Sequence, residues 1–316
     1  MPRLKVIVNP ASDRGRTAQI GEALQALLHE RAAVASEKGQ PYDLDWVLTE
    51  EPYHASELAE QAAREGFDIV VAIGGDGTVH EVVNGLMRID AKKRPTLGVI
   101  PVGTGNDFAH NVGLPLDLGD AAHCLFAGKT RLVDVCTISD DKGRQEYWDN
   151  TAGIGFSGAV NIAGRKLIKV RGFLRYLIAV LETILFRPPT IDARIQIDDQ
   201  PTSERAISMI SLCNGPREGG GFPVGPHAVM DDGKITYMIM RGMSRLMMLY
   251  FLPIVMNANH LKYKRYFEEA TAERLRIEAD RTLAIHADGE IFGSWEADVR
   301  QIEVGIIPAA IRVLCG

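Results

Sequence analysis

Short apolar runs alternate with longer stretches of helical period through the first 128 residues. The runs are rich in β-branched side chains, which favours strands, and they cover residues 4–8, 44–48, 69–73 and 97–100. The stretches between and after them repeat apolar residues with helical spacing, near residues 17–36, 54–65, 79–87 and 118–126. Strands that alternate with helices are typical of a parallel, doubly wound α/β sheet, which binds its ligand at the carboxyl ends of the strands.

The pattern changes beyond residue 129, where strand candidates follow one another with few helices between them. These candidates cover residues 191–197, 207–212, 235–240, 274–278, 282–286 and 301–306. Such a series favours a mainly antiparallel β domain, sandwich-like in form, with a few helices. We therefore expect an α/β domain over residues 1–129 and a β-rich domain over residues 130–316, whose last strand could return to the first domain.

Two glycine-rich breaks directly follow two of the apolar runs in the α/β half. They read Gly74-Gly75-Asp76-Gly77-Thr78 and Gly103-Thr104-Gly105-Asn106-Asp107. Glycines at the end of a strand let backbone N–H groups turn toward a phosphate without a Cβ in the way. The acid in each break suits the Mg²⁺ that accompanies a nucleoside triphosphate. The two breaks predict opposite walls of one nucleotide site and phosphoryl transfer as the chemistry.

The composition narrows the class of protein. With 46% apolar and 24% charged residues over 316 positions, a disordered chain is excluded, and a net charge of −6 argues against nucleic acid as a partner. The four cysteines show no CxxC or metal-binding spacing, which indicates reduced thiols. The start leaves no room for a signal peptide, and the longest apolar stretches fall short of the ~20 residues that span a bilayer, so we expect a cytoplasmic protein.

Seven short motifs follow one another along almost the whole chain. They are Asn9-Pro10, the first glycine break with Asn84-Gly85, the second break with Phe108-Ala109, Asn214-Gly215-Pro216, Gly219-Gly220-Gly221, Asp231-Asp232-Gly233 and Asp288-Gly289-Glu290. In this order they resemble the diacylglycerol kinase catalytic family, which includes soluble bacterial lipid kinases and the sphingosine and ceramide kinases. The resemblance implies an ATP-dependent kinase that phosphorylates a lipid hydroxyl, with diacylglycerol as the first candidate acceptor.

The resemblance also assigns cofactor contacts residue by residue. ATP would be contacted by Asn9, Thr49, Gly74, Gly75, Asp76, Gly77, Thr78, Val79, His80, Thr104, Asn106 and Asp107. One Mg²⁺ would be held through Asp76, Asp107 and Asp134. A second, structural Mg²⁺ would lie at Asp232, beside the backbone carbonyls of Val229 and Lys234. For the glycine breaks and for Asp232, the plainer alternatives are helix caps and an ordinary turn.

The base that takes the proton from the lipid hydroxyl is expected to be Asp288 or Glu290, and Asp76 would support the reaction through its metal. Residues two apart on a strand point to one face, so both acids could reach the hydroxyl. Glu290 is favoured, although the choice stays open, and the plainer alternative for the motif is a hairpin turn.

Two positions depart from the usual pattern of the family, and one motif is misleading. Asp13 stands where glycine is common, and His110 stands where arginine is common. Residues 153–158 fit the GxGxxG fingerprint of dinucleotide binding, but no acid follows ~20 residues later. We therefore interpret that string as a tightly packed start of a helix.

Lipid contact is expected at residues 165–186. The apolar face of the helix includes Phe173, Leu177, Val180, Leu181, Ile184 and Leu185, and its polar residues Arg175, Glu182 and Thr183 form a narrow stripe. Before and within the helix lie Arg165, Lys166, Lys169, Arg171 and Arg175, which suit the anionic head groups of the inner membrane face. A core helix and a solvated basic surface are the alternatives.

Three other functions stay open at this point. An NAD kinase has a similar fold and a GGDGT loop, a sphingoid base or another lipid alcohol could be the acceptor, and a catalytically silent nucleotide sensor is the alternative that is not an enzyme. The oligomeric state is open as well, with a homodimer as one option, and so is the choice between ATP and GTP.

Overall fold

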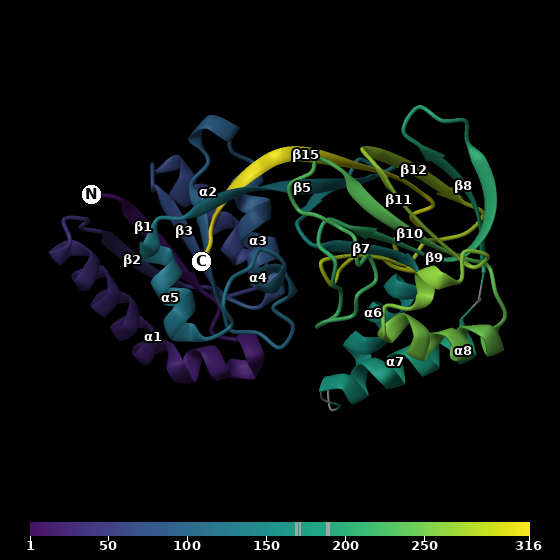
Figure 1. The fold of residues 1–316 in the computed structure, drawn as a ribbon, viewed down its shortest axis with the longest axis horizontal. Helices are drawn as coiled ribbons and strands as arrows, with labels where there is room; N and C mark the ends of the chain where they lie inside the picture. Colours follow the sequence, from purple (N-terminus) through teal and green to yellow (C-terminus); the bar gives the residue numbers. More distant parts are fainter. Residues whose placement is uncertain (168–169, 171, 188–189) are drawn as a thin grey trace. The chain divides into compact units, whose positions relative to one another are not determined.

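The computed structural model describes residues 1–167, 170, 172–187 and 190–316, which form two compact units (Figure 1). Unit 1 consists of Met1–Val135 and Pro308–Gly316, and unit 2 consists of Cys136–Ile307. The chain therefore passes between the units twice, within strand β5 (Thr130–Asp140) and within the last strand, β15 (Gln301–Leu314).

Unit 1 contains the parallel sheet that the sequence predicts. Its strands are β1 (Arg3–Val8), β2 (Asp43–Leu48), β3 (Ile69–Gly74) and β4 (Thr96–Pro101), joined by the end of β15 in the order β15-β4-β3-β1-β2. All of these neighbours pair in parallel. Residues 70–73 of β3 are fully buried, as expected for a strand covered on both faces.

Five α-helices accompany this sheet within the described residues. They are α1 (Ser12–Glu37), α2 (His54–Arg64), α3 (Asp76–Met87), α4 (Asp107–Asn111) and α5 (Leu118–Ala127). Leu28 of α1 and Leu125 of α5 share one core with Val71 and Ile73 of the sheet. Helices α2 and α3 pack closely, because a Cβ on Gly85 would lie only 2.1 Å from the carbonyl oxygen of Ser56.

Unit 2 is a mainly antiparallel β structure, which confirms the second part of the predicted fold class. Its strands, besides the parts of β5 and β15, are β6 (Gln145–Trp148), β7 (Thr151–Gly155), β8 (Ile191–Ile197), β9 (Ser203–Cys213), β10 (Ile235–Arg241), β11 (Phe267–Ala272), β12 (Arg274–Ala279), β13 (Ile285–Ala287) and β14 (Glu290–Gly293). Strand β9 pairs with β7, β8 and β10, and β13 pairs with both β7 and β14.

Three helices, α6 (Phe156–Lys166), α7 (Gly172–Phe186) and α8 (Arg245–Met256), lie together along one side of this β structure (Figure 1). Ile184 of α7 and Phe251 of α8 pack with Met209 of β9 and Met240 of β10 in one apolar cluster. Within the described residues, no helix is both long and apolar enough to cross a bilayer.

Candidate active site

The two glycine breaks lie against one another at one edge of the parallel sheet of unit 1. Strand β3 ends at Gly74 beside Pro101 of β4, and the N–H of Val102 donates to the carbonyl oxygen of Gly74 at 2.8 Å. A Cβ on Gly103 would lie 2.5 Å from the Cα of Gly75, which is closer than real Cβ contacts come. Glycine is therefore required by the close approach of the two backbones.

The other expected nucleotide residues of unit 1 gather at the same edge. Asn9 follows β1 and donates from Nδ2 to Oγ1 of Thr78 at 3.1 Å, while Ser12 Oγ lies 3.3 Å from the same hydroxyl. Thr49 follows β2, and its N–H donates to the carbonyl oxygen of Val8. The carboxyl ends of parallel strands and the amino end of α3 form the kind of edge that binds phosphate.

The three acids expected to hold Mg²⁺ all belong to unit 1. Asp76 accepts a hydrogen bond from the N–H of Phe108 at 3.1 Å, so its carboxylate joins α3 to α4. Asp107 is buried, and Asp134 is buried with Oδ1 2.7 Å from the N–H of Ala309. Carboxylates are the donors that Mg²⁺ prefers, but no cluster of three or more metal-ligating side chains occurs among the residues described. Magnesium coordination by these acids stays a prediction.

The expected second metal residue, Asp232, lies in a turn. Its Oδ1 accepts the N–H of Lys234 at 2.9 Å, and Gly233 has a φ of 72°. This arrangement is the ordinary turn that the sequence left as an alternative. A magnesium ion beside the carbonyls of Val229 and Lys234 remains a prediction.

The first loop after β1 shows what the departure at Asp13 means. Asp13, Arg14 and Gly15 have φ values of 45°, 59° and 86°, so the left-handed backbone that glycine adopts freely is present with an aspartate in it. Oδ1 of Asp13 lies 3.5 Å from the hydroxyl of Thr104, one of the expected ATP contacts. A negative charge therefore stands beside the expected phosphate site.

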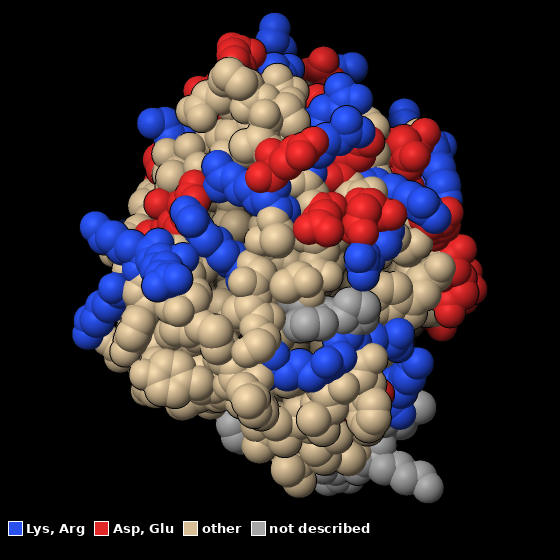
Figure 2. All heavy atoms as spheres, turned by 90° about the vertical axis from the view of Figure 1, so that its right-hand side faces the viewer, with Lys and Arg blue, Asp and Glu red and all other residues tan. Residues whose placement is uncertain are grey.

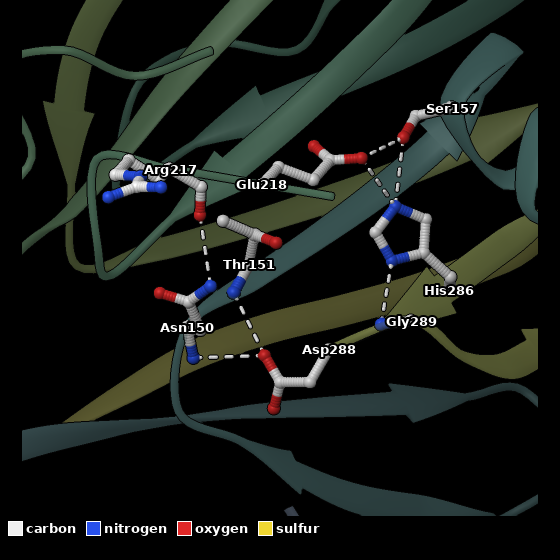
Figure 3. Close-up of polar contacts among 8 residues, drawn as sticks. All are labelled: Asn150, Thr151, Ser157, Arg217, Glu218, His286, Asp288 and Gly289. Carbon is white, nitrogen blue, oxygen red and sulfur yellow. Dashed lines mark hydrogen bonds and ion pairs between the residues drawn. The ribbon is translucent and has the colours of Figure 1, made fainter. Parts of the chain in front are cut away.

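In unit 2, Asp288 and Gly289 form the two-residue turn of the β13–β14 hairpin, with φ values of 50° and 83°. The carboxylate of Asp288 accepts the backbone N–H groups of Asp149, Asn150 and Thr151, each at 2.9 Å. Figure 3 shows the bonds from Asn150 and Thr151. Both of its carboxylate oxygens therefore accept hydrogen bonds from the connection between β6 and β7. Asp288 acts as an anchor of the hairpin in this structure.

Glu290 lies directly after this turn and has a different environment. Its side chain is about one-third exposed, and Oε2 is 2.5 Å from the guanidinium of Arg165 on α6. The expectation that the two acids share one face of a strand is corrected here, because Asp288 belongs to the turn and only Glu290 belongs to β14. Of the two acids, Asp288 accepts three backbone hydrogen bonds, whereas the carboxylate of Glu290 pairs with an exposed arginine.

A second polar cluster lies beside the same hairpin, and no motif of the sequence predicts it. Oε1 of Glu218 is 2.5 Å from Oγ of Ser157 and 3.0 Å from Nε2 of His286, and these two partners are 2.8 Å apart (Figure 3). The N–H of Gly289 donates to Nδ1 of His286 at 3.3 Å. The cluster is thus hydrogen-bonded to the turn that lies between Asp288 and Glu290.

The misleading GxGxxG string explains part of this geometry. A Cβ on Gly153 would lie 2.4 Å from Nε2 of His286 and 2.4 Å from Oγ of Ser157, so the glycine makes room for their contact. A Cβ on Gly158 would lie 2.2 Å from the carbonyl oxygen of Ala284. The string forms the end of β7 and the start of α6, packed tightly on β13, which confirms its interpretation as the start of a helix.

An apolar cavity of about 610 Å³, open mouth included, lies within unit 2. Its wall comes from α6, α7, α8, β9, β10 and the segment around 218–224, and it includes Met209, Met240, Met248 and Phe251. Tyr176 stacks on Phe222 at 4.4 Å between ring centroids, and both rings line the cavity. Ser157 and Glu218 are polar members of the lining, so the cluster described above forms its polar end.

The expected lipid-contact segment is only partly as the sequence predicts. Lys169 and Arg171 lie outside the described residues, as do the side chains of Phe173 and Arg175. Arg165 pairs with Glu290, and Thr183 is buried with its hydroxyl donating to the carbonyl oxygen of Ala179, so Thr183 does not belong to an exposed polar stripe. Leu181, Leu185 and Phe186 of α7 are exposed.

Comparison with protein families gives two matches that together cover most of the chain. The model "Diacylglycerol kinase catalytic domain" matches residues 3–138, and the model "YegS C-terminal NAD kinase beta sandwich-like domain" matches residues 150–315. The division between the two models falls between β5 and β7.

Two curated relatives are similar over nearly their whole length. The "Probable lipid kinase YegS-like" of Chromohalobacter salexigens is 31% identical over 288 residues, which cover 90% of this chain and 89% of that protein. The diacylglycerol kinase of Bacillus subtilis is 29% identical over 296 residues, covering 93% and 91%.

Solved structures share the fold. A diacylglycerol kinase from Bacillus anthracis superposes with a TM-score of 0.71 at 20% identity, covering 99% of this chain and 97% of that one. An NAD kinase from Archaeoglobus fulgidus, solved in complex with ATP, gives a TM-score of 0.50 at 14% identity, covering 99% and 93%. At these identities the similarity speaks for the fold alone.

Proposed function

The chain belongs to the diacylglycerol kinase catalytic family of lipid kinases, and we propose that it transfers the γ-phosphoryl group of ATP to the hydroxyl of diacylglycerol, which yields phosphatidic acid. The observation that carries this proposal is the apolar cavity of unit 2, whose polar end is hydrogen-bonded to the Asp288-Gly289-Glu290 turn. A lipid needs apolar walls for its chains and a carboxylate near its hydroxyl, and unit 2 offers both.

Glu290 serves as the base in this proposal, and Asp288 positions it. The guanidinium of Arg165 pairs with the carboxylate of Glu290, the group that accepts the proton in this proposal. As Glu290 takes the proton of the lipid hydroxyl, the oxygen bonds to the γ-phosphorus, the bond from that phosphorus to the β,γ-bridging oxygen breaks, and ADP leaves. Asp288 holds the turn through three backbone N–H groups, so Glu290 stays at the start of β14.

The edge of unit 1 binds ATP in this proposal. The glycine breaks bring backbone N–H groups close to the phosphates, and Asn9, Thr49 and Thr104 lie at the same sheet edge. Mg²⁺, when bound, would neutralise charge on the phosphate oxygens, and Asp76, Asp107 and Asp134 provide carboxylates of the kind it prefers.

The test is transfer of labelled phosphate from [γ-³²P]ATP to diacylglycerol in detergent micelles, with NAD as a second acceptor. We expect a labelled product that co-migrates with phosphatidic acid, no labelled NADP, and no transfer by Asp76→Ala. Label on NAD alone would replace this proposal with the NAD kinase function, and no label on any acceptor would remove it.

We also propose that unit 2 contacts a lipid surface through α7 and α8. Phe186 and Leu246 are 77% and 79% exposed, and Leu185 and Tyr250 are exposed as well. Figure 2 shows a mostly uncharged surface in the lower part of this face, crossed by a few Lys and Arg side chains, below a band of mixed charge. The same two helices line the apolar cavity, so the surface proposed to meet the lipid and the cavity proposed to hold it share α7 and α8.

Co-sedimentation with anionic vesicles tests this contact. Leu246→Glu should weaken binding about tenfold, since it removes one buried apolar side chain from the interface. Leu116 of unit 1 is also an exposed leucine, at 51%, so Leu116→Glu is the matched control and should bind like the native chain. Equal binding by all three proteins would contradict the proposal.

A further inference from the structure

Among the residues that the structure describes, the polar end of the apolar cavity includes a carboxylate oxygen without a hydrogen-bond partner. Oε1 of Glu218 accepts from Ser157 and from His286 (Figure 3). Oε2 of the same carboxylate is buried and accepts no hydrogen bond from any residue that the structure describes. Glu218 also lines the cavity, so this oxygen belongs to a group placed where a ligand would lie.

The hydrogen bonds around His286 determine where its proton lies. Because the N–H of Gly289 donates to Nδ1, the neutral ring carries its proton on Nε2. Nε2–H and the hydroxyl of Ser157 therefore point their hydrogens toward Glu218. Both partners are arranged as donors to a carboxylate.

Glu218 is consequently held as an anion. Burial by itself would raise the pKa of Glu218, but the interactions of its carboxylate with His286 and Ser157 outweigh this effect, so the pKa lies below its ordinary value. A buried carboxylate oxygen without a donor is unfavourable, and a bound molecule that donates a hydrogen bond would relieve this cost.

We propose that Glu218 is a specificity-determining residue that accepts a hydrogen bond from the polar head of the lipid, so that the site takes lipid alcohols with a second donor beside the hydroxyl that is phosphorylated. The proposal rests on the lipid kinase function proposed above. It deepens that function, because it names a second acceptor class besides diacylglycerol.

The chemistry of the cavity explains this class. The ester groups of diacylglycerol offer only hydrogen-bond acceptors to Glu218, whereas a monoacylglycerol has a second hydroxyl and a long-chain 2-amino-1,3-diol has an ammonium group. Both can donate to Oε2, and both have a single chain for the methionine-rich cavity. The shared feature is the second donor.

The experiment measures kcat/KM for diacylglycerol, for monoacylglycerol of the same chain length and for a long-chain 2-amino-1,3-diol. Glu218→Gln removes the charge at nearly constant shape. We expect kcat/KM to fall roughly 10- to 100-fold for the two acceptors with a second donor, the range for one hydrogen bond to a charged group, and less than threefold for diacylglycerol. A loss confined to the amino diol identifies the ammonium as the recognised group, and a loss for both identifies the hydroxyl as well.

The matched control is Glu269→Gln. Glu269 also pairs with a histidine, His227 at 2.5 Å, but it does not line the cavity. This variant should keep the native ratio between acceptors. Equal losses across the three acceptors in Glu218→Gln, or the same ratio change in Glu269→Gln, would overturn the proposal.

Two further measurements separate this proposal from the kinase function. If Glu218→Gln fails to fold, Ser157→Ala should shift the acceptor ratio in the same direction, because it removes one of the two donors that fix the carboxylate. Binding of short-chain amino diol by calorimetry without ATP should weaken in Glu218→Gln. If no lipid is phosphorylated by the native chain, the kinase proposal falls, and the calorimetric comparison still decides whether Glu218 binds the head group.

Discussion

Each unit has a candidate binding region of its own, and the two regions are built differently. At the sheet edge of unit 1 the main feature is backbone, since a Cβ on Gly103 would lie 2.5 Å from the Cα of Gly75. At the polar end of the cavity in unit 2 the main feature is side chains, with Ser157, Glu218 and His286 within 3.0 Å of one another. Binding at the sheet edge of unit 1 should therefore be weakened by a larger side chain. Binding at the polar end of the cavity in unit 2 should be weakened by the loss of a charge or of a hydrogen-bond donor.

The largest expected effect concerns the base. Glu290→Gln keeps the shape of the side chain and removes its ability to take a proton, so kcat should fall by roughly 10²–10⁴. The KM for ATP should stay within about twofold, because no nucleotide contact is changed. Steady-state kinetics with diacylglycerol and ATP measure both values, and Glu303→Gln, at an exposed position of β15, is the control.

A companion variant separates the two acids of the hairpin. Asp288→Asn weakens the acceptor of three backbone N–H groups, so it should lower the melting temperature clearly, whereas Glu290→Gln should hardly change it. If Asp288→Asn kept full stability and lost all turnover, Asp288 would be the base and the assignment would be reversed.

The next effect concerns the sheet edge of unit 1, where the two glycine breaks lie against one another. Gly103→Ala places a Cβ 2.5 Å from the Cα of Gly75, so the two turns must separate, at a cost of about 1–3 kcal/mol. ATP affinity should fall at least tenfold, as measured by calorimetry with a slowly hydrolysed ATP analogue. Gly21→Ala is the matched control, because a Cβ there meets nothing within 4 Å and the residue lies in α1. If both variants lost ATP affinity equally, the close approach of Gly75 and Gly103 would not explain ATP binding.

The same contrast explains what the sequence could predict. A glycine break directly after an apolar run is a local signal, so the order of strands and helices in unit 1 and the position of both breaks follow from neighbouring residues. Strand alternation likewise predicts the antiparallel class of unit 2. In contrast, β7 contains Gly153 and Gly155 and is buried along its whole length, so it shows no alternation that would mark it as a strand.

The side-chain cluster could not be predicted in this way. Ser157, Glu218 and His286 come from three segments that are distant in sequence. Ser157 meets His286 because β13 pairs with β7 and α6 packs on β13, and Glu218 joins them from the segment that follows β9. Each residue lies within or beside a glycine-containing motif: Ser157 is part of the GxGxxG string, Glu218 precedes Gly219, and His286 comes two residues before Asp288. The only local hint was a polar residue beside each of these motifs.

A smaller effect concerns Asp13, a charged side chain in the loop after β1. Asp13→Gly removes a negative charge 3.5 Å from the hydroxyl of Thr104, and the KM for ATP should fall about two- to fivefold, the range of one exposed charge interaction. Relief of the left-handed backbone and the added freedom of the unfolded chain oppose each other, so the free energy of unfolding should change by less than about 1 kcal/mol. Asp13→Asn should give the same KM change, and an unchanged KM in both variants would show that Asp13 does not face the phosphates.

The smallest expected effect is a pH dependence of stability, and it concerns the polar end of the cavity in unit 2. The pKa of Glu218 is below its ordinary value of 4.5, since His286 and Ser157 outweigh the effect of burial. A carboxylate with a lowered pKa in the folded state stabilises the fold above the pKa of the unfolded chain and loses that contribution as the pH falls through the folded value. Denaturant unfolding from about pH 6 to about pH 3 should therefore show a steeper loss of stability in the native chain than in Glu218→Gln, with Ser157→Ala between them because one of the bonds that lower the pKa is gone. Parallel curves for all three proteins would mean that His286 and Ser157 do not hold Glu218 as an anion, and the contrast between a backbone part and a charged side-chain part would lose its basis.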